Sequence, residues 1–500
     1  MTVCVTALGA VRGSVSPDGV ASFLGVPYAA PPFGPRRFRA PAPPEPWTGV
    51  RDATAYGPTA PHAPYAPPFD ALVPDDVIPG EDCLNLNIWT PAPEPGAGLP
   101  VMVWLHGGAF SNGAGSASAY DGSAFARDGV VCVTLNYRLG AEGFLRLPGV
   151  PDNRGLLDQV AALSWIRAHI AAFGGDPDQV TVFGESAGAM SIGVLLSTGG
   201  ARGLFRRAIL ESGACHHFLR PASAARIASR LAAKLGVEPA PDTFAAVPLA
   251  DLLPAQAELR AEMGARPDPA LWGEAVLNIM PFEPAAADLP LPGPDCGVDL
   301  LIGSNSEEYR FFLVPTERLE TVSETALRAG TAAYGLDPDR ALPRYRATRP
   351  GATPGDLLAA VATDWFYRIP AIRLAESVPG SYLYGFAWRS PRFRARLGAC
   401  HTLELAFVFD RLRDPSYRPV LGDRPPQDLA DACTERGSPS RRPATPAGPR
   451  TTSPPAPRTS SPRTAPCWTT RGKRNAGSGK ACARGPLHGP PVPACAAGLS

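Results

Sequence analysis

The sequence predicts an α/β fold with a mostly parallel central sheet, flanked by helices and carrying helical cap insertions. Short apolar runs bounded by glycine, proline and asparagine alternate with helical stretches, a pattern typical of strands and helices packed in layers. The 500 residues are 45% hydrophobic and 19% charged, which is typical of a soluble globular protein with a buried core. Length alone leaves open one large domain or two.

The individual elements can be assigned in chain order. The candidate strands are Val101–Leu105, Val130–Leu135, Val180–Phe183, Ala208–Leu210, Leu300–Ile302 and Tyr382–Phe386. The clearest helix begins near Asp152 or Asn153, where an Asx side chain is expected to cap free backbone N–H groups, and continues to about Phe173. Its apolar positions recur at spacings of three and four and are expected to face the sheet. These positions are Leu156, Val160, Leu163, Ile166 and Ile170.

Two further segments complete the expected architecture. Gly174–Pro177 should end the helix and turn the chain into the strand 180–183. Between about Pro221 and Leu289 the chain is rich in Ala, Leu and Arg with helical periodicity. We expect this region to cap the carboxyl edge of the sheet, where such insertions shape a substrate pocket.

The segment Val180–Gly188 joins a β-run to a G-x-S-x-G motif, and a helix-like stretch follows. A serine at a tight strand-to-helix turn is held in strained geometry, and Gly184 and Gly188 leave room for neighbouring backbone. The helix also points its N-terminal N–H groups at the site, which favours a developing oxyanion. Chance occurrence in a glycine-rich chain is the alternative. The flanking elements favour Ser186 as a nucleophile.

A second segment, Val101–Phe110, is a strand that ends in an HGG turn. Acyl transfer places negative charge on the former carbonyl oxygen, so backbone N–H donors must be positioned to receive it. The candidate donors are the N–H groups of Gly108, Ala109 and Ala187. His106 could serve as a general base, but its place at the strand end favours a structural role.

Several segments together resemble the type B carboxylesterase/lipase family, which includes cholinesterases and bacterial esterases, over roughly residues 7–432. The resemblance implies the α/β-hydrolase fold, a serine carboxylic-ester hydrolase and a triad in chain order Ser, Glu, His. The segments that carry the resemblance are Phe23–Ala29, Glu81–Asn87, Asn136–Arg138, Phe173–Pro177 and Gly184–Gly188.

The resemblance also nominates the other two members of the triad. The acid lies in a G-x-x-x-[DE]-E segment, here Gly303–Glu308, which points to Glu308. Spacing alone does not choose between Glu308 and the adjacent Glu307. The segment Gly398–Phe409 resembles the catalytic-histidine loop of the family, with His401 as the base. The remaining histidines lack a supporting motif and are expected to be surface or structural residues: His62, His169, His216, His217 and His488.

These assignments predict a cofactor-free mechanism. His401 accepts the proton of Ser186 during attack and returns it to the leaving alcohol, while Glu308 orients and stabilises the imidazolium. Water activated by His401 then hydrolyses the acyl-enzyme. Neither a metal nor an organic cofactor is expected, and the expected ligand is a small-molecule ester.

Charge and cysteine content exclude other classes. Residues 433–500 hold eleven basic residues and one acidic residue, so the preceding chain is net acidic, which argues against nucleic acid as a partner. We expect no membrane partner, because no apolar run is long enough to span a bilayer. We expect a cytoplasmic location, because no secretory signal is recognised. The stretch 5–82 contains no cysteine, so Cys83 is expected to be a free thiol. The absence of Trp between Arg51 and Asp82 argues against choline esters as preferred substrates.

The chain is expected to divide into a hydrolase domain over residues 1–432 and a Pro- and Arg-rich tail over residues 433–500. Such a tail buries too little apolar surface to offset its ordering entropy, so disorder is expected. A sharper hypothesis is a reading-frame shift after Ala432. The peptide VHGAWVAFATTGDPGWPAYD resembles the C-terminal helix of the family. When codons chosen for this peptide lose their first base, the shifted reading frame encodes the sequence Cys433–Thr451.

Two alternatives to an active esterase follow. Cholinesterase-like domains also serve as adhesion proteins, so a catalytically inactive binding protein is one, although the presence of Ser186, Glu308 and His401 argues against it. The other is an esterase impaired by an aberrant C-terminus, with apolar surface uncovered near His401 and low stability as a result.

Overall fold

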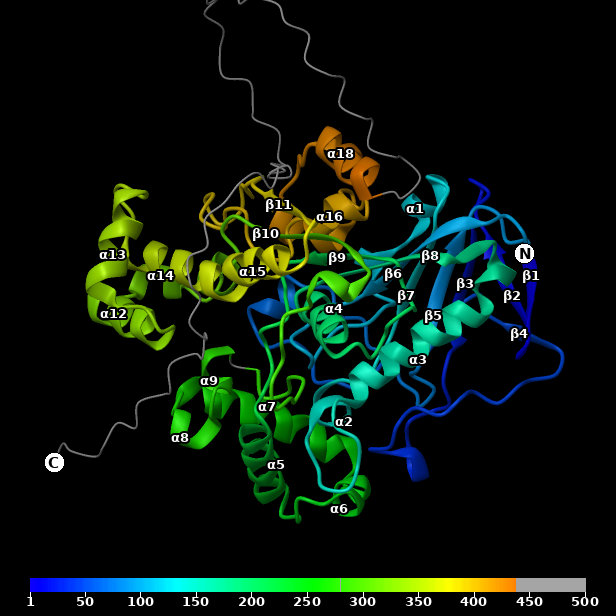
Figure 1. Ribbon diagram of the computed structural model, residues 1–500, viewed down its shortest axis with the longest axis horizontal. Helices are drawn as coiled ribbons and strands as arrows, with labels where there is room; N and C mark the ends of the chain where they lie inside the picture. Colours follow the sequence, from blue (N-terminus) through cyan, green and yellow to red (C-terminus); the bar gives the residue numbers. More distant parts are fainter. Residues whose placement is uncertain (279, 438–500) are drawn as a thin grey trace, which may run out of the picture.

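A large twisted sheet forms the centre of the molecule, for which the computed structural model describes residues 1–278 and 280–437 (Figure 1). Its 11 strands in this part of the chain follow the order β1-β2-β3-β5-β7-β6-β8-β9-β10-β11, with β4 paired to β2. The strands are β1 Thr2–Thr6, β2 Gly9–Val15, β3 Ala21–Pro27, β4 Val50–Asp52, β5 Asn85–Thr90, β6 Leu99–Leu105, β7 Val131–Leu135, β8 Gly175–Glu185, β9 Arg207–Glu211, β10 Asp299–Asn305 and β11 Tyr382–Phe386.

All the strands expected from the apolar runs are present, and they form the parallel part of the sheet from β7 to β11. The fold prediction is therefore confirmed. The antiparallel part, from β1 through β5 to β7, was not predicted. In β5 this is because buried Asn85, Asn87 and Thr90 interrupt the apolar run, and their burial is visible only once the neighbouring strands are in place.

Helices cover both faces of the sheet and extend beyond it. The first nine are α1 Ser123–Arg127, α2 Gly140–Phe144, α3 Arg154–His169, α4 Ala187–Thr198, α5 Pro221–Leu235, α6 Pro241–Ala246, α7 Leu249–Ala265, α8 Pro269–Trp272 and α9 Ala275–Asn278. The others are α10 Arg310–Leu313, α11 Arg318–Thr321, α12 Glu324–Ala333, α13 Pro338–Ala347, α14 Pro354–Thr363, α15 Ile369–Ser377, α16 Leu405–Val408, α17 Arg418–Leu421 and α18 Gln427–Gly437.

Strand β6 shows how the two faces of the sheet are built. Val101, Val103 and Leu105 belong to one hydrophobic core, whereas Met102 and Trp104 belong to another. Successive side chains of a strand point to opposite faces, so a continuous apolar run is what a strand covered on both sides requires. The continuous apolar run in β6 is therefore explained by the burial of this strand on both faces of the sheet.

The start of α3 differs from the prediction. Asn153 occupies the N-cap position in a left-handed conformation (φ 56°), and its side chain makes no capping bond. Instead its Oδ1 accepts a hydrogen bond from the Ala285 N–H (2.6 Å) and its Nδ2 donates to the Ala285 carbonyl (2.9 Å). The Asx cap is wrong because a distant segment competes for the same side chain. The helix ends at His169, and a 3₁₀ turn, Ile170–Phe173, leads to Gly174.

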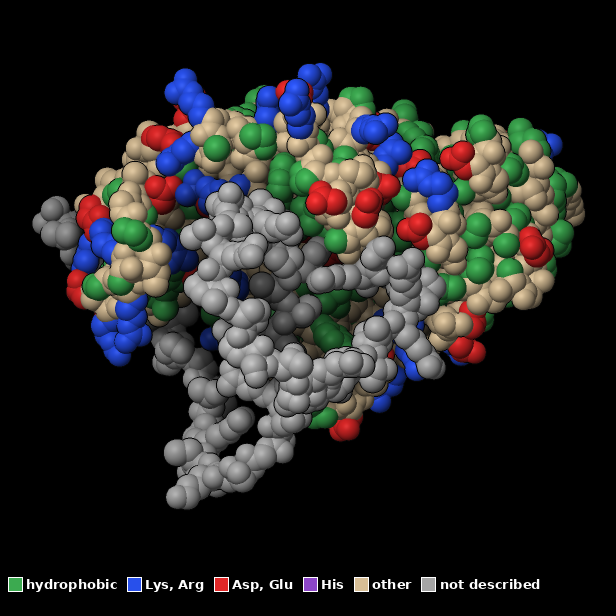
Figure 2. Space-filling model, turned by 90° about the horizontal axis from the view of Figure 1, so that it is seen from above, with side chains coloured by type: hydrophobic (Ala, Val, Ile, Leu, Met, Phe, Trp, Pro, Cys, Tyr) green, Lys and Arg blue, Asp and Glu red, His purple; other side chains and the backbone are tan. Residues whose placement is uncertain are grey.

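The cap predicted between Pro221 and Leu289 consists of α5 to α9, which are grouped on one side of the sheet in Figure 1. In the described part of the chain, none of the helices is long and apolar enough to cross a bilayer. On the face shown in Figure 2, basic and acidic side chains are interspersed.

Two details concern the cysteines and the C-terminal region. Cys83 is buried and free, as expected, and so are Cys4, Cys132, Cys215 and Cys400.

Helix α18 continues past the expected domain end at residue 432 to Gly437, and Cys433 in it is buried. The expected disorder and frame-shifted stretch otherwise lie outside the described residues.

Candidate active site

Ser186 sits at the turn between β8 and α4 with φ 53° and ψ −122°, a strained conformation for a residue with a side chain. A Cβ on Gly184 would lie 2.7 Å from the Leu105 carbonyl oxygen, and one on Gly188 only 1.9 Å from the same oxygen. Only glycine fits at these two positions, because the end of β6 passes directly beside the turn. Ser186 itself keeps part of its surface exposed while both its neighbours are buried.

The HGG turn after β6 lies against this serine. A Cβ on Gly107 would be 3.1 Å from the Ser186 Cβ, so the missing side chain lets the loop approach. Gly108 and Ala109 both have positive φ, 115° and 54°. Within the described residues, the N–H groups of Gly108, Ala109 and Ala187 donate to no other group, which leaves the three predicted oxyanion donors free. They fit the role that the sequence suggested.

His106 lies just before this loop and has the surroundings of a structural residue. Its ring stacks on Tyr137, with centroids 4.5 Å apart, and its Nδ1 lies 2.8 Å from the Gly107 carbonyl oxygen. Burial lowers the His106 pKa to about 4, so the ring is neutral near pH 7.

His401 and Glu308, far apart in the sequence, meet beside this turn. His401 Nδ1 lies 2.7 Å from Glu308 Oε2, and both residues are buried. Glu307 points elsewhere and pairs with Arg310 (3.0 Å) and Arg389 (2.7 Å). Of the two glutamates, Glu308 is thus the one in contact with His401, which spacing alone could not decide.

The Glu308 carboxylate is held from its other side as well. Its Oε1 accepts hydrogen bonds from the Ser212 hydroxyl (2.5 Å) and from the Asn305 backbone N–H (2.6 Å). The carboxylate thus has donors on both oxygens. Ser212 also lies 3.2 Å from Glu404 Oε1, and the Asn305 amide donates to Glu404 Oε2, so Glu404 joins the same buried network.

Glu185, immediately before the serine, forms the opposite wall. Its Oε1 lies 3.1 Å from His401 Nε2, so the imidazole stands between two carboxyl groups. Burial raises the Glu185 pKa well above its usual range, and Glu308 raises it further. Both effects disfavour the ionised form of Glu185. In the described chain, the Ser186 hydroxyl makes no hydrogen bond to His401, as is common before a substrate tightens the site.

Aromatic rings enclose the imidazole. Phe312 and Tyr367 lie with ring centroids 5.4 Å and 4.8 Å from that of His401. Tyr367 belongs to a π-helical turn, Asp364–Arg368, between α14 and α15. Single π-helical turns are rare and often occur at functional sites. This turn brings a buried aromatic side chain against the histidine.

Sequence reasoning assigned no role to Glu185, Ser212, Asn305, Glu404 or Tyr367. For the two glutamates a signal was present, because Glu185 precedes the serine and Glu404 follows His401 by one helical turn. Ser212 follows β9 and Asn305 is the last residue of β10, and neither position carries such a signal.

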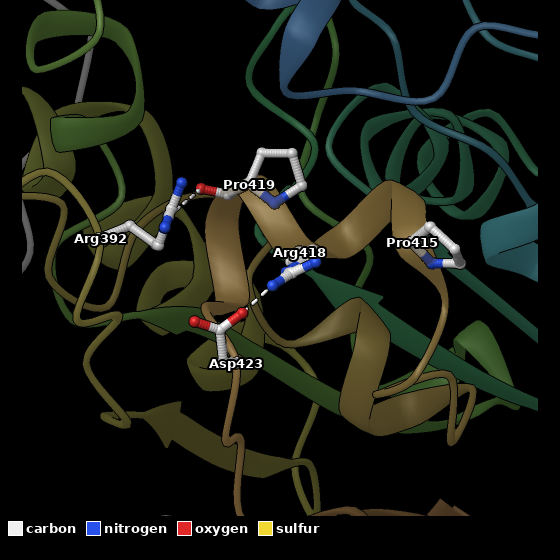
Figure 3. Close-up of a pocket in the computed structure, with 5 residues that line it drawn as sticks. All are labelled: Arg392, Pro415, Arg418, Pro419 and Asp423. Carbon is white, nitrogen blue, oxygen red and sulfur yellow. Dashed lines mark hydrogen bonds and ion pairs between the residues drawn. The ribbon is translucent and has the colours of Figure 1, made fainter.

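Two surface cavities lie apart from the triad residues. One of about 350 Å³ is lined by Arg392, Pro415, Arg418, Pro419 and Asp423 (Figure 3). Arg418 Nε is 2.7 Å from Asp423 Oδ1, and Arg392 Nε donates to the Pro419 carbonyl oxygen (3.1 Å). The other, about 360 Å³, is lined by Tyr65 and by parts of the segments 64–75 and 416–419.

Comparison with known proteins agrees with this geometry. The sequence model of the carboxylesterase family matches residues 1–419. The chain belongs to this family. It is 40% identical over 438 residues to a para-nitrobenzyl esterase of Bacillus subtilis (strain 168), covering 82% of this chain and 83% of the relative.

Other relatives of this carboxylesterase point the same way. It is 35% identical over 432 residues to a phenmedipham hydrolase of Pseudarthrobacter oxydans, covering 84% and 85% of the two chains. A crystal structure of a Geobacillus stearothermophilus carboxylesterase matches it with a TM-score of 0.72 at 36% identity, covering 85% of this chain and 87% of that one. The protein is a carboxylic-ester hydrolase with the α/β-hydrolase fold.

Proposed function

We propose that the enzyme hydrolyses small carboxylic esters through an acyl-enzyme on Ser186. The observation that carries this proposal is the 2.7 Å contact between His401 and Glu308 beside a serine held in a strained strand-to-helix turn. Ser186, Glu308 and His401 come from distant parts of the chain and meet at this place. A purely structural role for any one of them would not require the other two to be there. The arrangement supports nucleophilic catalysis with a positioned base.

In the proposed first step, the Ser186 oxygen attacks the ester carbonyl and His401 takes the hydroxyl proton. For this, the Nε2 that faces Glu185 must accept a hydrogen bond from Ser186 instead. The N–H groups of Gly108, Ala109 and Ala187 receive the negative charge of the tetrahedral intermediate. His401 then gives the proton to the leaving alcohol, and the acyl group remains on Ser186.

In the second step, water gives a proton to His401 and attacks the acyl carbonyl, which releases the carboxylic acid and restores Ser186. Glu308 stabilises the imidazolium in both steps. The hydrogen bonds from Ser212 and Asn305 to Glu308 support this role, because they keep its second oxygen from turning away.

We also propose that residues 1–432 contain the complete catalytic set and that the enzyme acts in the cytoplasm. The first is supported by the position of His401 and its partners before residue 432. The second is supported by the free, buried thiol of Cys83, since secreted proteins more often pair such cysteines.

The test is hydrolysis of p-nitrophenyl acetate by the purified, monodisperse protein beside Ser186→Ala. We expect turnover by the wild type and its loss in the variant. Incubation with a fluorophosphonate, followed by mass spectrometry, should place one adduct on Ser186. A folded wild type that neither turns over the ester nor forms the adduct would refute the proposal and favour the binding protein. Ester turnover that survives in Ser186→Ala would equally refute it.

A further inference from the structure

The loop that carries His401 has no regular structure of its own. Between β11 and α16, residues 387–404 form neither a helix nor a strand, apart from one isolated bridge between Ser390 and Gly398. The position of His401 against Glu308 therefore depends on the contacts that this loop makes with its neighbours. A displacement of about 1 Å at a catalytic group can cost up to about a hundredfold in rate. The contacts of the loop thus bear directly on the reaction.

Glu307, the residue before Glu308, contacts this loop with both its backbone and its side chain. Its N–H donates to the Ala399 carbonyl (2.9 Å), and its Oε2 accepts a hydrogen bond from the Ala399 N–H (3.1 Å). In an ordinary antiparallel pair the backbone carbonyl would accept that second bond, but the Glu307 carbonyl already accepts one from the Arg310 N–H (3.1 Å). The His401 N–H in turn donates to the Glu308 carbonyl (3.2 Å). The Glu307 carboxylate therefore completes the pairing between the two segments.

The carboxylate of Glu307 is fixed from its other sides by two arginines. Arg310 Nε lies 3.0 Å from Oε1, and Arg389 Nη1 lies 2.7 Å from Oε2. Arg310 is itself held in place, because its remaining nitrogens reach Asp356 (2.8 Å) and the Arg396 carbonyl (2.7 Å). A carboxylate bound in this way keeps its acceptor oxygen directed at the loop.

Gly398 leaves the room that this carboxylate occupies. Its φ is 66°, and a Cβ at this position would overlap Glu307 Oε2. Glycine meets both requirements, because it tolerates a positive φ and has no Cβ. A plainer role for Glu307 is that of a surface ion pair, and exposed pairs contribute little to stability. Such a pair would need neither the missing side chain of Gly398 nor the bond to the Ala399 N–H.

We propose that Glu307 is a positioning residue for the triad, and that its carboxylate holds the loop of His401 against Glu308 through the Ala399 N–H. This inference rests on the proposed function, because it concerns the same site. Glu307 does not touch the imidazole and acts through the loop that carries it. Glu308 stabilises the imidazolium directly, so the two adjacent glutamates have different roles at one site.

The test separates the reach of the Glu307 side chain from its charge. Glu307→Asp keeps the charge but is one methylene shorter, so it no longer reaches the Ala399 N–H. Glu307→Gln keeps the reach and an acceptor oxygen but loses the charge. Glu307→Ala removes both. His401 acts in both steps of the reaction, so we expect kcat for p-nitrophenyl acetate to fall at least about tenfold in the Asp and Ala variants, with KM within about twofold of wild type. In Glu307→Gln, kcat should stay within about threefold of wild type.

Hydrogen–deuterium exchange followed by mass spectrometry reads the loop without turnover. The peptide that contains the Ala399 and His401 amides should exchange at least about fivefold faster in Glu307→Asp than in wild type, and at nearly the wild-type rate in Glu307→Gln. Peptides from β6 should exchange equally in all the proteins. Unchanged exchange there shows that the effect is local and that the fold as a whole is not destabilised.

Glu320→Ala is the matched control, because it removes another glutamate that pairs with the same loop. Glu320 is exposed on α11, and its Oε1 lies 3.0 Å from Arg396 Nη2. It reaches a side chain of the loop, whereas Glu307 reaches the backbone. Both kcat and the exchange of the loop should therefore remain as in the wild type.

The comparison of Glu307→Asp with Glu307→Gln stands even if Glu307→Ala does not fold. A wild-type kcat in Glu307→Asp, wild-type exchange of its loop, or equal losses in the Asp and Gln variants would overturn the proposal. Failure of the catalytic proposal has a different signature. A folded wild type that does not hydrolyse the ester, but whose loop exchanges faster only when the reach of Glu307 is lost, would support the positioning of the loop and refute only the catalytic proposal.

Discussion

Removal of the Ser212 hydroxyl tests whether the buried network behind Glu308 contributes to catalysis. Ser212→Ala deletes the 2.5 Å hydrogen bond to Glu308 Oε1 and the 3.2 Å contact with Glu404. The Asn305 N–H, 2.6 Å away, remains as the one other donor to that oxygen among the described residues. Ser212 has φ 52°, a strained value, but serine and alanine both carry a Cβ, so the substitution leaves the backbone strain unchanged.

The expected loss follows from the strength of such bonds. A hydrogen bond to a charged group contributes about 1.5–3 kcal/mol. The imidazolium forms only during reaction, so an optimally placed Glu308 is needed most in the transition state. At about 1.4 kcal/mol per tenfold, kcat/KM should fall roughly tenfold to a hundredfold. The loss should appear in kcat, with KM little changed, because Ser212 is buried and does not face the substrate.

The assay is steady-state hydrolysis of p-nitrophenyl acetate, with urea unfolding of each variant measured alongside. Ser164→Ala is the matched control and should behave as wild type. It removes an exposed helical hydroxyl that, within the part of the chain the structure describes, bonds only to the Val160 carbonyl. Ser186→Ala must abolish the same activity, which shows that the assay reports this active site. A kcat/KM for Ser212→Ala within about twofold of wild type would then refute the positioning argument, since the expected loss is larger.

Two further outcomes follow from packing and burial. Gly188→Ala should abolish soluble expression or cooperative melting, because its Cβ would lie 1.9 Å from the Leu105 carbonyl oxygen. Gly200→Ala is the control and should melt as wild type, because its Cβ has room. Equal melting of the two variants would contradict the close approach. Burial raises the Glu283 pKa to about 8, so the folded protein keeps a proton that an unfolded glutamate loses near pH ~4.3. Unfolding free energy should therefore fall as pH rises between these values, and Glu283→Gln should flatten the fall by up to roughly 1.4 kcal/mol per pH unit in urea titrations. Parallel pH profiles for the two proteins would contradict this.

The conformational consequences of single residues were accessible from the sequence. The run Val180–Phe183 predicted a strand, and Gly184 and Gly188 around Ser186 predicted a turn that neighbouring backbone approaches closely. Both are local properties, because backbone sterics and the period of apolar residues act within a few positions. The same holds for the HGG turn and its free N–H groups, which depend on the loop itself.

Partnerships between distant segments were decided by the tertiary structure. Glu307 and Glu308 are adjacent and chemically identical, and only the fold brings one of them to His401 and the other to two arginines. Asn153 was predicted as a cap, yet the backbone of Ala285 takes its side chain.

Glu404 shows the same division between sequence and structure. In the sequence it lies three residues after His401, and in the fold its carboxylate contacts Ser212 and Asn305 in the buried network behind Glu308. Burial and charge pairing depend on which segments meet, so they belong to the assembled structure and not to any local stretch of the chain. The sequence by itself determined the turn, its serine and the strands that carry them. The tertiary structure decided which charged and polar groups meet around them.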